Sequence, residues 1–184
     1  MKPVDSTLIQ PRLAALRGKM KEGGYDAYFI VTDDFHASEY VGDYFKCREY
    51  VSGFDGSAGS LVVLPEEAGL WTDGRYFLQA EEQLRGTGIT LQRIGEKGVP
   101  ELEEYLAKKL SSGGVLGFDG RTVSAAQQKK LREKLGEKVR FVIDRDLVDE
   151  IWEDRPKMSA DCAGKSGLYA HGESGLSDTG GVRH

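Results

Sequence analysis

The stretch from Val51 to Ala80, VSGFDGSAGSLVVLPEEAGLWTDGRYFLQA, is the part around which the rest of this chain is organised. Its apolar run SLVVL is rich in β-branched residues and lacks helical spacing, which is typical of a buried strand. Its last residues, in contrast, have helical spacing. The stretch therefore predicts, in order, a glycine-rich bend, a strand, a turn, a second strand, a loop and a helix (residues 52–59, 60–64, 65–69, 70–72, 73–75 and 76–84).

One arginine, Arg75, stands where the predicted loop meets the predicted helix. It is either a solvated residue at a helix start or a guanidinium that donates paired hydrogen bonds to a carbonyl or carboxylate. Local chemistry alone favours the first alternative and leaves the second open. The neighbouring glycines do not predict a phosphate-binding loop, because they do not follow the pattern G-x-x-x-x-G-K-[ST].

The rest of the sequence alternates strands and helices. A first helix is expected to begin at Asp5 or Ser6 and to end at Gly23 and Gly24. The remaining expected elements are a central strand, a half-exposed strand, a helix, a strand, a helix, a strand and a short final helix (residues 25–31, 88–94, 100–112, 115–119, 125–135, 139–143 and 146–152). This order predicts a three-layer α/β fold, with a mixed sheet of about six strands flanked by helices.

Two long motifs, residues 51–59 and 70–80, resemble the amino-terminal domain of Xaa-Pro aminopeptidases. The similarity is to the long, three-domain form of aminopeptidase P. Shorter matches in the same order support it (residues 27–30, 36–40, 47–48, 147–152 and 154–156). The resemblance covers about residues 8–158 and implies a creatinase-type amino-terminal domain, the same kind of α/β fold that the pattern predicts. One domain is therefore expected over residues 1–158.

The composition is that of an ordinary globular protein, with 39% hydrophobic and 30% charged residues. A net charge of −5 argues against nucleic acids or anionic membranes as partners. No apolar run approaches the roughly 20 residues of a membrane helix, and the amino terminus lacks the apolar centre of a signal peptide. Cys47 and Cys162 are too few and too far apart in the sequence for a disulfide scaffold or a cysteine zinc site. A cytoplasmic location is expected.

An acidic segment with a histidine, which includes Asp33, Asp34, His36 and Glu39, raises the question of a metal site. The spacing does not let all four residues meet at one ion, so local hydrogen bonding is the favoured interpretation. His36 is expected to be a polar anchor, and the resemblance places its loop near the mouth of an active site. Cys47 has two basic neighbours but no nearby base, so a structural thiol is expected there.

Residues 159–184 are rich in glycine and have almost no periodic apolar residues. Such a composition is expected to stay disordered, because it buries too little surface to offset chain entropy. The resembled family carries two metal ions, usually manganese, in a separate catalytic domain, and no segment here matches the motifs of that domain. No catalytic or metal-binding residue is therefore assigned, and this chain is expected to be inactive alone.

The resemblance implies that such a first domain overhangs the active-site cleft and limits it to short peptides. It also implies that the arginine of the motif Asp-Gly-Arg-Tyr-Phe, here Arg75, meets the substrate, with His36 and Asp73 at its edge. The leading hypothesis is a non-catalytic domain of an Xaa-Pro aminopeptidase, an enzyme that releases the first residue of peptides with proline second. Its partners would be such peptides, the remaining domains and a second copy of the parent enzyme.

The alternative hypothesis is a standalone, non-catalytic peptide- or protein-binding module with the same creatinase-like fold. A creatine-hydrolysing enzyme is disfavoured, because both long motifs are similar to those of the peptidases.

Overall fold

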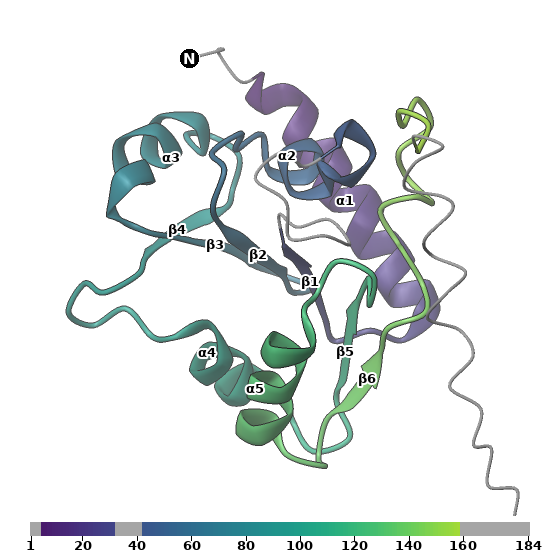
Figure 1. Cartoon of the computed structure of the whole chain (residues 1–184). Helices are drawn as coiled ribbons and strands as arrows, with labels where there is room; N and C mark the ends of the chain where they lie inside the picture. The colour runs from purple at the N-terminus through teal and green to yellow at the C-terminus, as the bar shows by residue number, and fades with distance from the viewer. Residues whose placement is uncertain (1–4, 32–41, 159–184) are drawn as a thin grey trace, which may run out of the picture.

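In this computed structural model, the described residues are 5–31 and 42–158. They contain one six-stranded sheet and the helices around it (Figure 1). The elements are α1 (Ser6–Gly23), β1 (Ala27–Val31), the 3-10 helix η1 (Asp43–Phe45), α2 (Cys47–Ser52), β2 (Ser60–Val63), β3 (Ala68–Thr72), the 3-10 helix η2 (Gly74–Tyr76), α3 (Phe77–Gln83), β4 (Thr90–Arg93), α4 (Leu102–Lys109), β5 (Val115–Phe118), α5 (Ala125–Leu135) and β6 (Arg140–Val142).

The strand order in the sheet is β4-β3-β2-β1-β5-β6. The central hairpin of β2 and β3 is antiparallel, β2 also runs antiparallel to β1, and the pairs β3–β4, β1–β5 and β5–β6 are parallel. Five strands therefore share one direction, and β2 alone opposes them. The carboxyl ends of those five strands lie at one edge of the sheet, which is where ligand sites of open α/β sheets commonly form. The loop that precedes β2 reaches the same edge.

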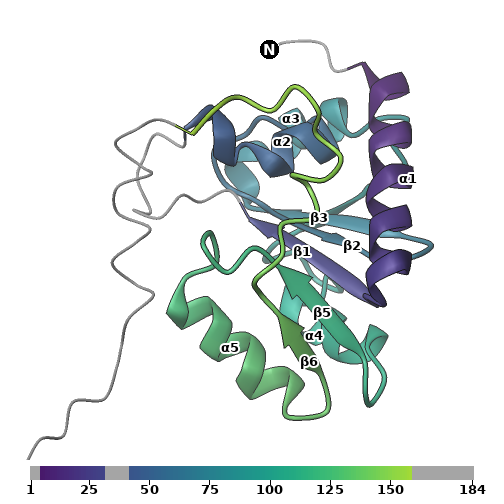
Figure 2. The ribbon, with the colours of Figure 1, turned by 90° about the vertical axis from the view of Figure 1, so that its right-hand side faces the viewer.

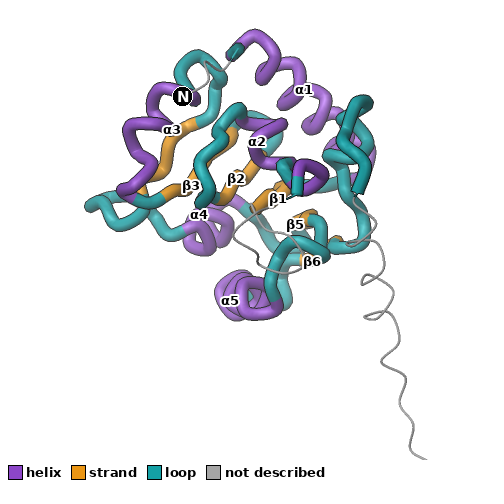
Figure 3. The backbone as a smooth tube through the Cα atoms, turned by 45° about the horizontal axis from the view of Figure 1, so that its top comes forward, coloured by secondary structure: helices purple, strands orange, loops and turns teal. Residues whose placement is uncertain are grey.

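Helices cover both faces of the sheet, which makes three layers (Figures 1 and 2). One apolar core joins the sheet to α1, α2 and α3, and a second joins it to α4 and α5. The central strand β1 serves both cores, since Tyr28 and Ile30 belong to the first and Phe29 and Val31 to the second. Figure 3 shows the strands as a row between the two groups of helices. The predicted α/β fold with a mixed six-stranded sheet is confirmed.

Local signals explain the first helix well. The side chain of Asp5 accepts a hydrogen bond from the backbone N–H of Thr7 (3.0 Å), so Asp5 is its N-cap. At the other end Gly24 takes a left-handed conformation with φ 69° and closes the helix, as glycine does readily. Four buried residues face the sheet at helical spacing, namely Ile9, Leu13, Leu16 and Met20.

Two local predictions need correction. The segment before the glycine-rich bend forms the helix α2, which extends to Ser52, so the bend begins one residue later than expected. Residues 146–152 form turns in place of the expected final helix. The phenolic oxygen of Tyr28 accepts a hydrogen bond from the N–H of Leu147 (3.0 Å), and the carboxylate of Asp146 accepts from Val148 (3.0 Å). Such contacts also suit the start of a helix, but only one bond of helical spacing follows, from the N–H of Trp152 to the carbonyl of Val148 (3.0 Å). The N–H of Arg155 then donates to Trp152 (3.2 Å), so the segment closes a single turn before Pro156, which has no N–H to continue a helix.

In the part of the chain that the structure describes, no helix has both the length and the apolar character needed to cross a membrane. The predicted tail, residues 159–184, and the acidic segment that contains His36 lie outside the described residues.

Candidate functional site

Asp73 and Arg75 lie directly after β3, at the edge of the sheet where the carboxyl ends of five strands lie. Asp73 follows β3 directly and accepts a hydrogen bond from the backbone N–H of Arg75 (3.0 Å), which caps η2. The 3-10 turn then runs into α3. A tight cap at this joint directs the Arg75 side chain outward, and 73% of that side chain is exposed.

Arg75 and Asp73 also form a two-point ion pair. Nε of Arg75 donates to Oδ1 of Asp73 and Nη2 donates to Oδ2, both at 2.9 Å. Hydrogen bonds from Arg75 lower the pKa of Asp73 to about 2, and the same contacts raise the pKa of Arg75 above its usual value. Asp73 therefore both caps η2 and holds the guanidinium of Arg75. Both groups keep their charges across the physiological pH range.

The pairing with Asp73 occupies only one edge of the guanidinium fork. Within residues 5–31 and 42–158, Nη1 of Arg75 has no hydrogen-bond acceptor. Since a guanidinium presents five N–H donors in one plane, the remaining donors can meet a carbonyl or a carboxylate from outside this domain. The arrangement is that of a held, solvent-facing cation, and it suits an anionic or carbonyl ligand.

The glycine-rich loop, residues 53–59, lies beside Arg75. The hydroxyl of Ser57 shares a short hydrogen bond with the hydroxyl of Tyr76, and the edge of one ring meets the face of the other between Phe54 and Tyr76 (centroids 6.2 Å apart). The guanidinium of Arg75 in turn lies 5.3 Å from the centre of the Tyr76 ring. The two long motifs are thus brought into contact by the fold, with Tyr76 between them.

Polar side chains of α3 also hydrogen-bond to the glycine-rich loop. Nε2 of Gln79 and of Gln83 both donate to Oδ1 of Asp55, at 2.6 and 2.7 Å, and the N–H of Asp55 donates to Gln83 (3.2 Å). Thr72 at the end of β3 donates to the carbonyl of Ala58 (2.7 Å). Sequence reasoning missed these contacts, although the i, i+4 spacing of the two glutamines on one helix face was available as a signal.

Arg48 is the other residue that sequence reasoning missed at this site. Only 2% of it is exposed, and its guanidinium donates to the carbonyls of Gly59 (3.1 Å), Phe54 (3.5 Å) and Gly56. Burial lowers its pKa to about 10. Periodicity and composition carry no signal for such a residue, because an arginine in a polar segment normally faces solvent.

Cys47 is a buried thiol, as expected for a structural cysteine. Burial raises its pKa to about 12, which opposes the thiolate that its basic sequence neighbours suggested. Nη2 of Arg155 donates to its sulfur (3.0 Å), and the same arginine pairs with Asp146 (2.7 Å) and Asp149 (2.8 Å). This network fastens the last described segment to α2 and gives no nucleophile.

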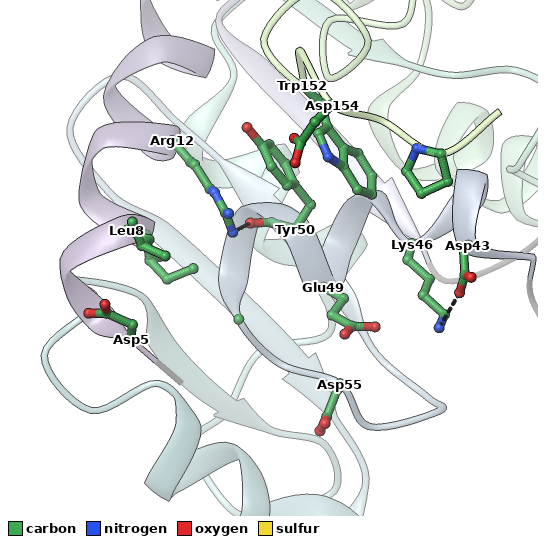
Figure 4. A pocket seen from close by; sticks show the side chains of 13 residues that line it. Asp5, Leu8, Arg12, Asp43, Lys46, Glu49, Tyr50, Asp55, Trp152 and Asp154 are labelled. Atoms are coloured by element: carbon green, nitrogen blue, oxygen red, sulfur yellow. Dashed lines mark hydrogen bonds and ion pairs between the residues drawn. The ribbon is translucent and has the colours of Figure 1, made fainter. Parts of the chain in front are cut away.

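A groove of about 460 Å³ lies between α1, α2 and the segment that ends at Pro156 (Figure 4). The ring of Tyr50 stacks on that of Trp152 (centroids 4.3 Å apart), and the guanidinium of Arg12 covers the other face of Tyr50 at 4.0 Å. Figure 4 also shows Lys46 paired with Asp43 at its rim. Arg75 is not among the lining residues, but Gly53 and Asp55 are, so the groove and the arginine site lie on either side of the glycine-rich loop.

No group of three or more His, Cys, Asp or Glu side chains placed to hold a metal ion occurs within residues 5–31 and 42–158. The acidic segment considered as a metal candidate, with His36, lies outside those ranges.

The fold is a mixed-sheet α/β domain with six strands between two groups of helices. Residues 12–151 match the family model described as the creatinase/prolidase N-terminal domain, and the chain belongs to that family. The resemblance seen in the two sequence motifs is thereby confirmed.

The similar proteins include several Xaa-Pro aminopeptidases. Aminopeptidase P2 of Arabidopsis thaliana is 43% identical over 156 residues, which cover 82% of this chain and 22% of that protein. The crystal structure of X-prolyl aminopeptidase from Caenorhabditis elegans, described as a cytosolic enzyme with a di-nuclear active site, has a TM-score of 0.74 at 34% identity and covers 81% of this chain and 26% of that one.

A third match is the crystal structure of the N-terminal domain of the cytoplasmic peptidase PepQ from Mycobacterium tuberculosis. It has a TM-score of 0.55 at 28% identity, and the match covers 77% of this chain and 98% of that one. This chain thus spans about a quarter of the length of the full-length relatives and nearly all of a solved N-terminal domain.

Proposed function

We propose that residues 1–158 are the first, non-catalytic domain of a cytoplasmic Xaa-Pro aminopeptidase and that Arg75 binds the substrate. The parent enzyme would release the first residue of peptides whose second residue is proline. Support comes from the names of the similar proteins and from the share of their length that this chain covers. The observation that carries the proposal is the exposed guanidinium of Arg75, held on one edge by Asp73 and open on the other.

The catalytic chemistry would come from two manganese ions held outside this domain. Two metal ions in such an enzyme polarise the scissile carbonyl and activate a water molecule. This domain would contribute a wall of the cleft and a fixed cation. Asp73 would keep the cation in place, and His36 would lie at the edge of the cleft. The guanidinium would pair with the carbonyl or carboxylate end of a short peptide, since its donors form a fork that matches both groups.

The test is the substitution Arg75→Ala in a full-length enzyme that contains residues 1–158 as its first domain. Loss of a hydrogen bond to a charged group is worth about 1.5–3 kcal/mol, so KM for a tripeptide with proline second should rise at least about tenfold. Arg85→Ala is the matched control. Arg85 is also exposed and lies just beyond α3, and its substitution removes the same charge. Unchanged KM in the Arg75 variant would contradict the proposal.

Amidation of the peptide carboxyl terminus sharpens this test. If Arg75 binds the carboxylate, amidation should raise KM in the wild-type enzyme and have little further effect in the Arg75→Ala variant. If it binds a carbonyl, amidation should act alike in both.

The 184-residue chain offers a second test. Supplied with manganese and the same tripeptide, it should show no hydrolysis, because the residues that bind the metals lie elsewhere in the parent enzyme. Measurable turnover by this chain alone would overturn the assignment of a non-catalytic domain. Tight peptide binding without turnover would instead favour the alternative of a standalone binding module.

A further inference from the structure

Arg48 carries a buried positive charge without a carboxylate partner. Among the described residues, no Asp or Glu oxygen lies within ion-pairing distance of its guanidinium, and Nε has no hydrogen-bond partner. The charge is met instead by three backbone carbonyls of one loop, those of Phe54, Gly56 and Gly59. The Phe54 ring also lies 4.8 Å from the guanidinium carbon, as in a cation–π contact.

Stability alone does not explain this arrangement. Removal of a charge from water is unfavourable, and apolar side chains of similar volume often serve as well or better in a core. What a guanidinium adds is geometry, because its planar fork can bind several carbonyl oxygens at defined angles. Arg48 therefore acts on the shape of the loop over residues 53–59.

The loop is built to bring its carbonyls to this one side chain. Gly53 closes α2 with φ 76°, a left-handed conformation that turns the chain back toward Arg48. A side chain at Gly56 would collide with the Phe54 ring, and one at Gly59 would stand 3.0 Å from Nη1 of Arg48. The glycines thus permit the close approach, and Arg48 fills the space they leave.

The ordered loop in turn contacts the arginine site through Tyr76. Ser57 hydrogen-bonds the Tyr76 hydroxyl, Phe54 packs edge-on against its ring, and the guanidinium of Arg75 lies over that ring. A continuous series of contacts therefore joins a buried cation to an exposed one. Each contact limits the freedom of the next side chain.

We propose that Arg48 is a positioning residue for Arg75: it fixes the glycine-rich loop, and the loop holds the Tyr76 ring against which Arg75 is placed. The inference rests on the proposed role of Arg75 in substrate binding. It assigns to Arg48 a function in peptide affinity, although Arg48 itself is buried and does not reach a ligand.

The decisive variant is Arg48→Lys, which keeps the charge and loses the planar fork. In the full-length enzyme, KM for the tripeptide should rise about three- to tenfold while kcat changes less than twofold, because a misplaced Arg75 loses binding and no reacting group is touched. In an Arg75→Ala background, the same substitution should leave KM unchanged. A residue with a merely structural role would act equally in both backgrounds.

Tyr76→Phe tests the same path without altering the buried charge. It removes the contact with Ser57, and one hydrogen bond of about 1 kcal/mol predicts a rise in KM of up to about fivefold. This rise should again vanish when Arg75 is alanine. If Arg48→Lys does not fold, the Tyr76 variant decides the proposal: a rise confined to enzymes that retain Arg75 supports it, and an unchanged KM overturns it.

One control separates mispositioning from a general loss of stability. Leu131→Ala on the far side of the sheet should lower the unfolding midpoint at least as much as Arg48→Lys without changing KM.

The Arg75→Ala variant separates this inference from the proposal on which it rests. If Arg75→Ala leaves KM unchanged, the proposed function fails. If Arg75→Ala raises KM but Arg48→Lys raises it equally in both backgrounds, or in neither, the positioning role fails.

Nuclear magnetic resonance on the 184-residue chain gives a readout independent of activity. The Nε–Hε signal of Arg75 should shift and broaden in Arg48→Lys and stay in place in Leu131→Ala. An unchanged Arg75 signal in Arg48→Lys would also overturn the positioning role.

Discussion

On the face of the sheet that α4 and α5 cover, the buried side chains that the structure describes are apolar except for Glu103, which pairs with Lys130 (3.1 Å), whereas on the face that α2 and α3 cover, several polar side chains are buried. Among the described residues, the first face relies on leucines such as Leu106 and Leu131, both fully buried. The second buries Arg48, Ser52, Gln83 and Thr87. Each of these four hydrogen-bonds to a backbone group or to another side chain.

The two faces therefore contribute differently: one mainly to the stability of the domain, the other to the positions of the loop and its side chains. Apolar contacts are strong and non-directional, so they hold a sheet to its helices without specifying a precise loop shape. Buried polar groups contribute less net free energy but demand defined distances and angles. The polar face is also the one that borders Arg75. We therefore expect substitutions on the two faces to affect different measurements.

The largest effect on stability is expected on the apolar face. Leu131→Ala should lower the free energy of unfolding by about 2–5 kcal/mol, because it removes a fully buried side chain and leaves a cavity. Urea denaturation of the 184-residue chain measures this. Lys129→Ala, on the exposed side of the same helix, is the control and should stay within about 0.5 kcal/mol of the wild type. If Leu131→Ala raised KM in the full-length enzyme as Arg75→Ala does, the two faces would not be independent.

A smaller effect is expected in the glycine-rich loop, and it should reach both measurements. Gly56→Ala places a methyl group against the Phe54 ring and should cost about 1–3 kcal/mol. It should also raise KM, since the loop supports Tyr76. Gly18→Ala is the matched control: its methyl group meets nothing within 4 Å on α1, and alanine should add up to about 1 kcal/mol of helix stability. A change in stability without a change in KM would separate the loop from the site.

The third effect appears only at alkaline pH. The folded pKa of Cys47 is about 12, and that of a free thiol is near 9. Below pH 9 the protonated thiol is retained in both states and its contribution to stability is complete. Between pH 9 and 12 the unfolded chain loses this proton while the folded chain keeps it, so stability should fall as pH rises.

This pH effect can be isolated by comparison of Cys162→Ser with Cys162→Ser/Cys47→Ala. As pH rises from 8 to 11, the free energy of unfolding of the variant that keeps Cys47 should fall relative to that of the alanine variant. At pH 8, a disulfide reagent should modify Cys47 far more slowly in buffer than in denaturant. Rapid modification in the folded chain would show that the thiol is not buried as described.

Much of the fold could be predicted, because it depends on local patterns. The β-branched run of β2, the cap at Asp5 and the spacing of α5 each act over a few residues, and the predicted bounds lie within one residue of the observed ones. The short helix α2 was missed, although Cys47 and Val51 lie four apart with Gly53 after them. The expected final helix is wrong, because the segment closes only one turn, from Trp152 to Val148, before it reaches Pro156.

Only the exposed part of the candidate site could be predicted from the sequence. Arg75 and Asp73 are adjacent in the sequence, so their pairing and the cap at η2 follow from local chemistry. Arg48 is 27 positions before Arg75, and its burial depends on carbonyls that the loop presents only after β2 and β3 have paired. No propensity scale reports such a side chain.

Spacing along the chain predicts most of the strands and helices, the family and the arginine where β3 ends, because these signals are local. The burial of Arg48, the contact of Tyr76 with both long motifs and the open edge of the Arg75 fork become visible only in the folded domain. A side chain's partners and its exposure are set by groups distant in the sequence, and these groups meet only when both cores have formed.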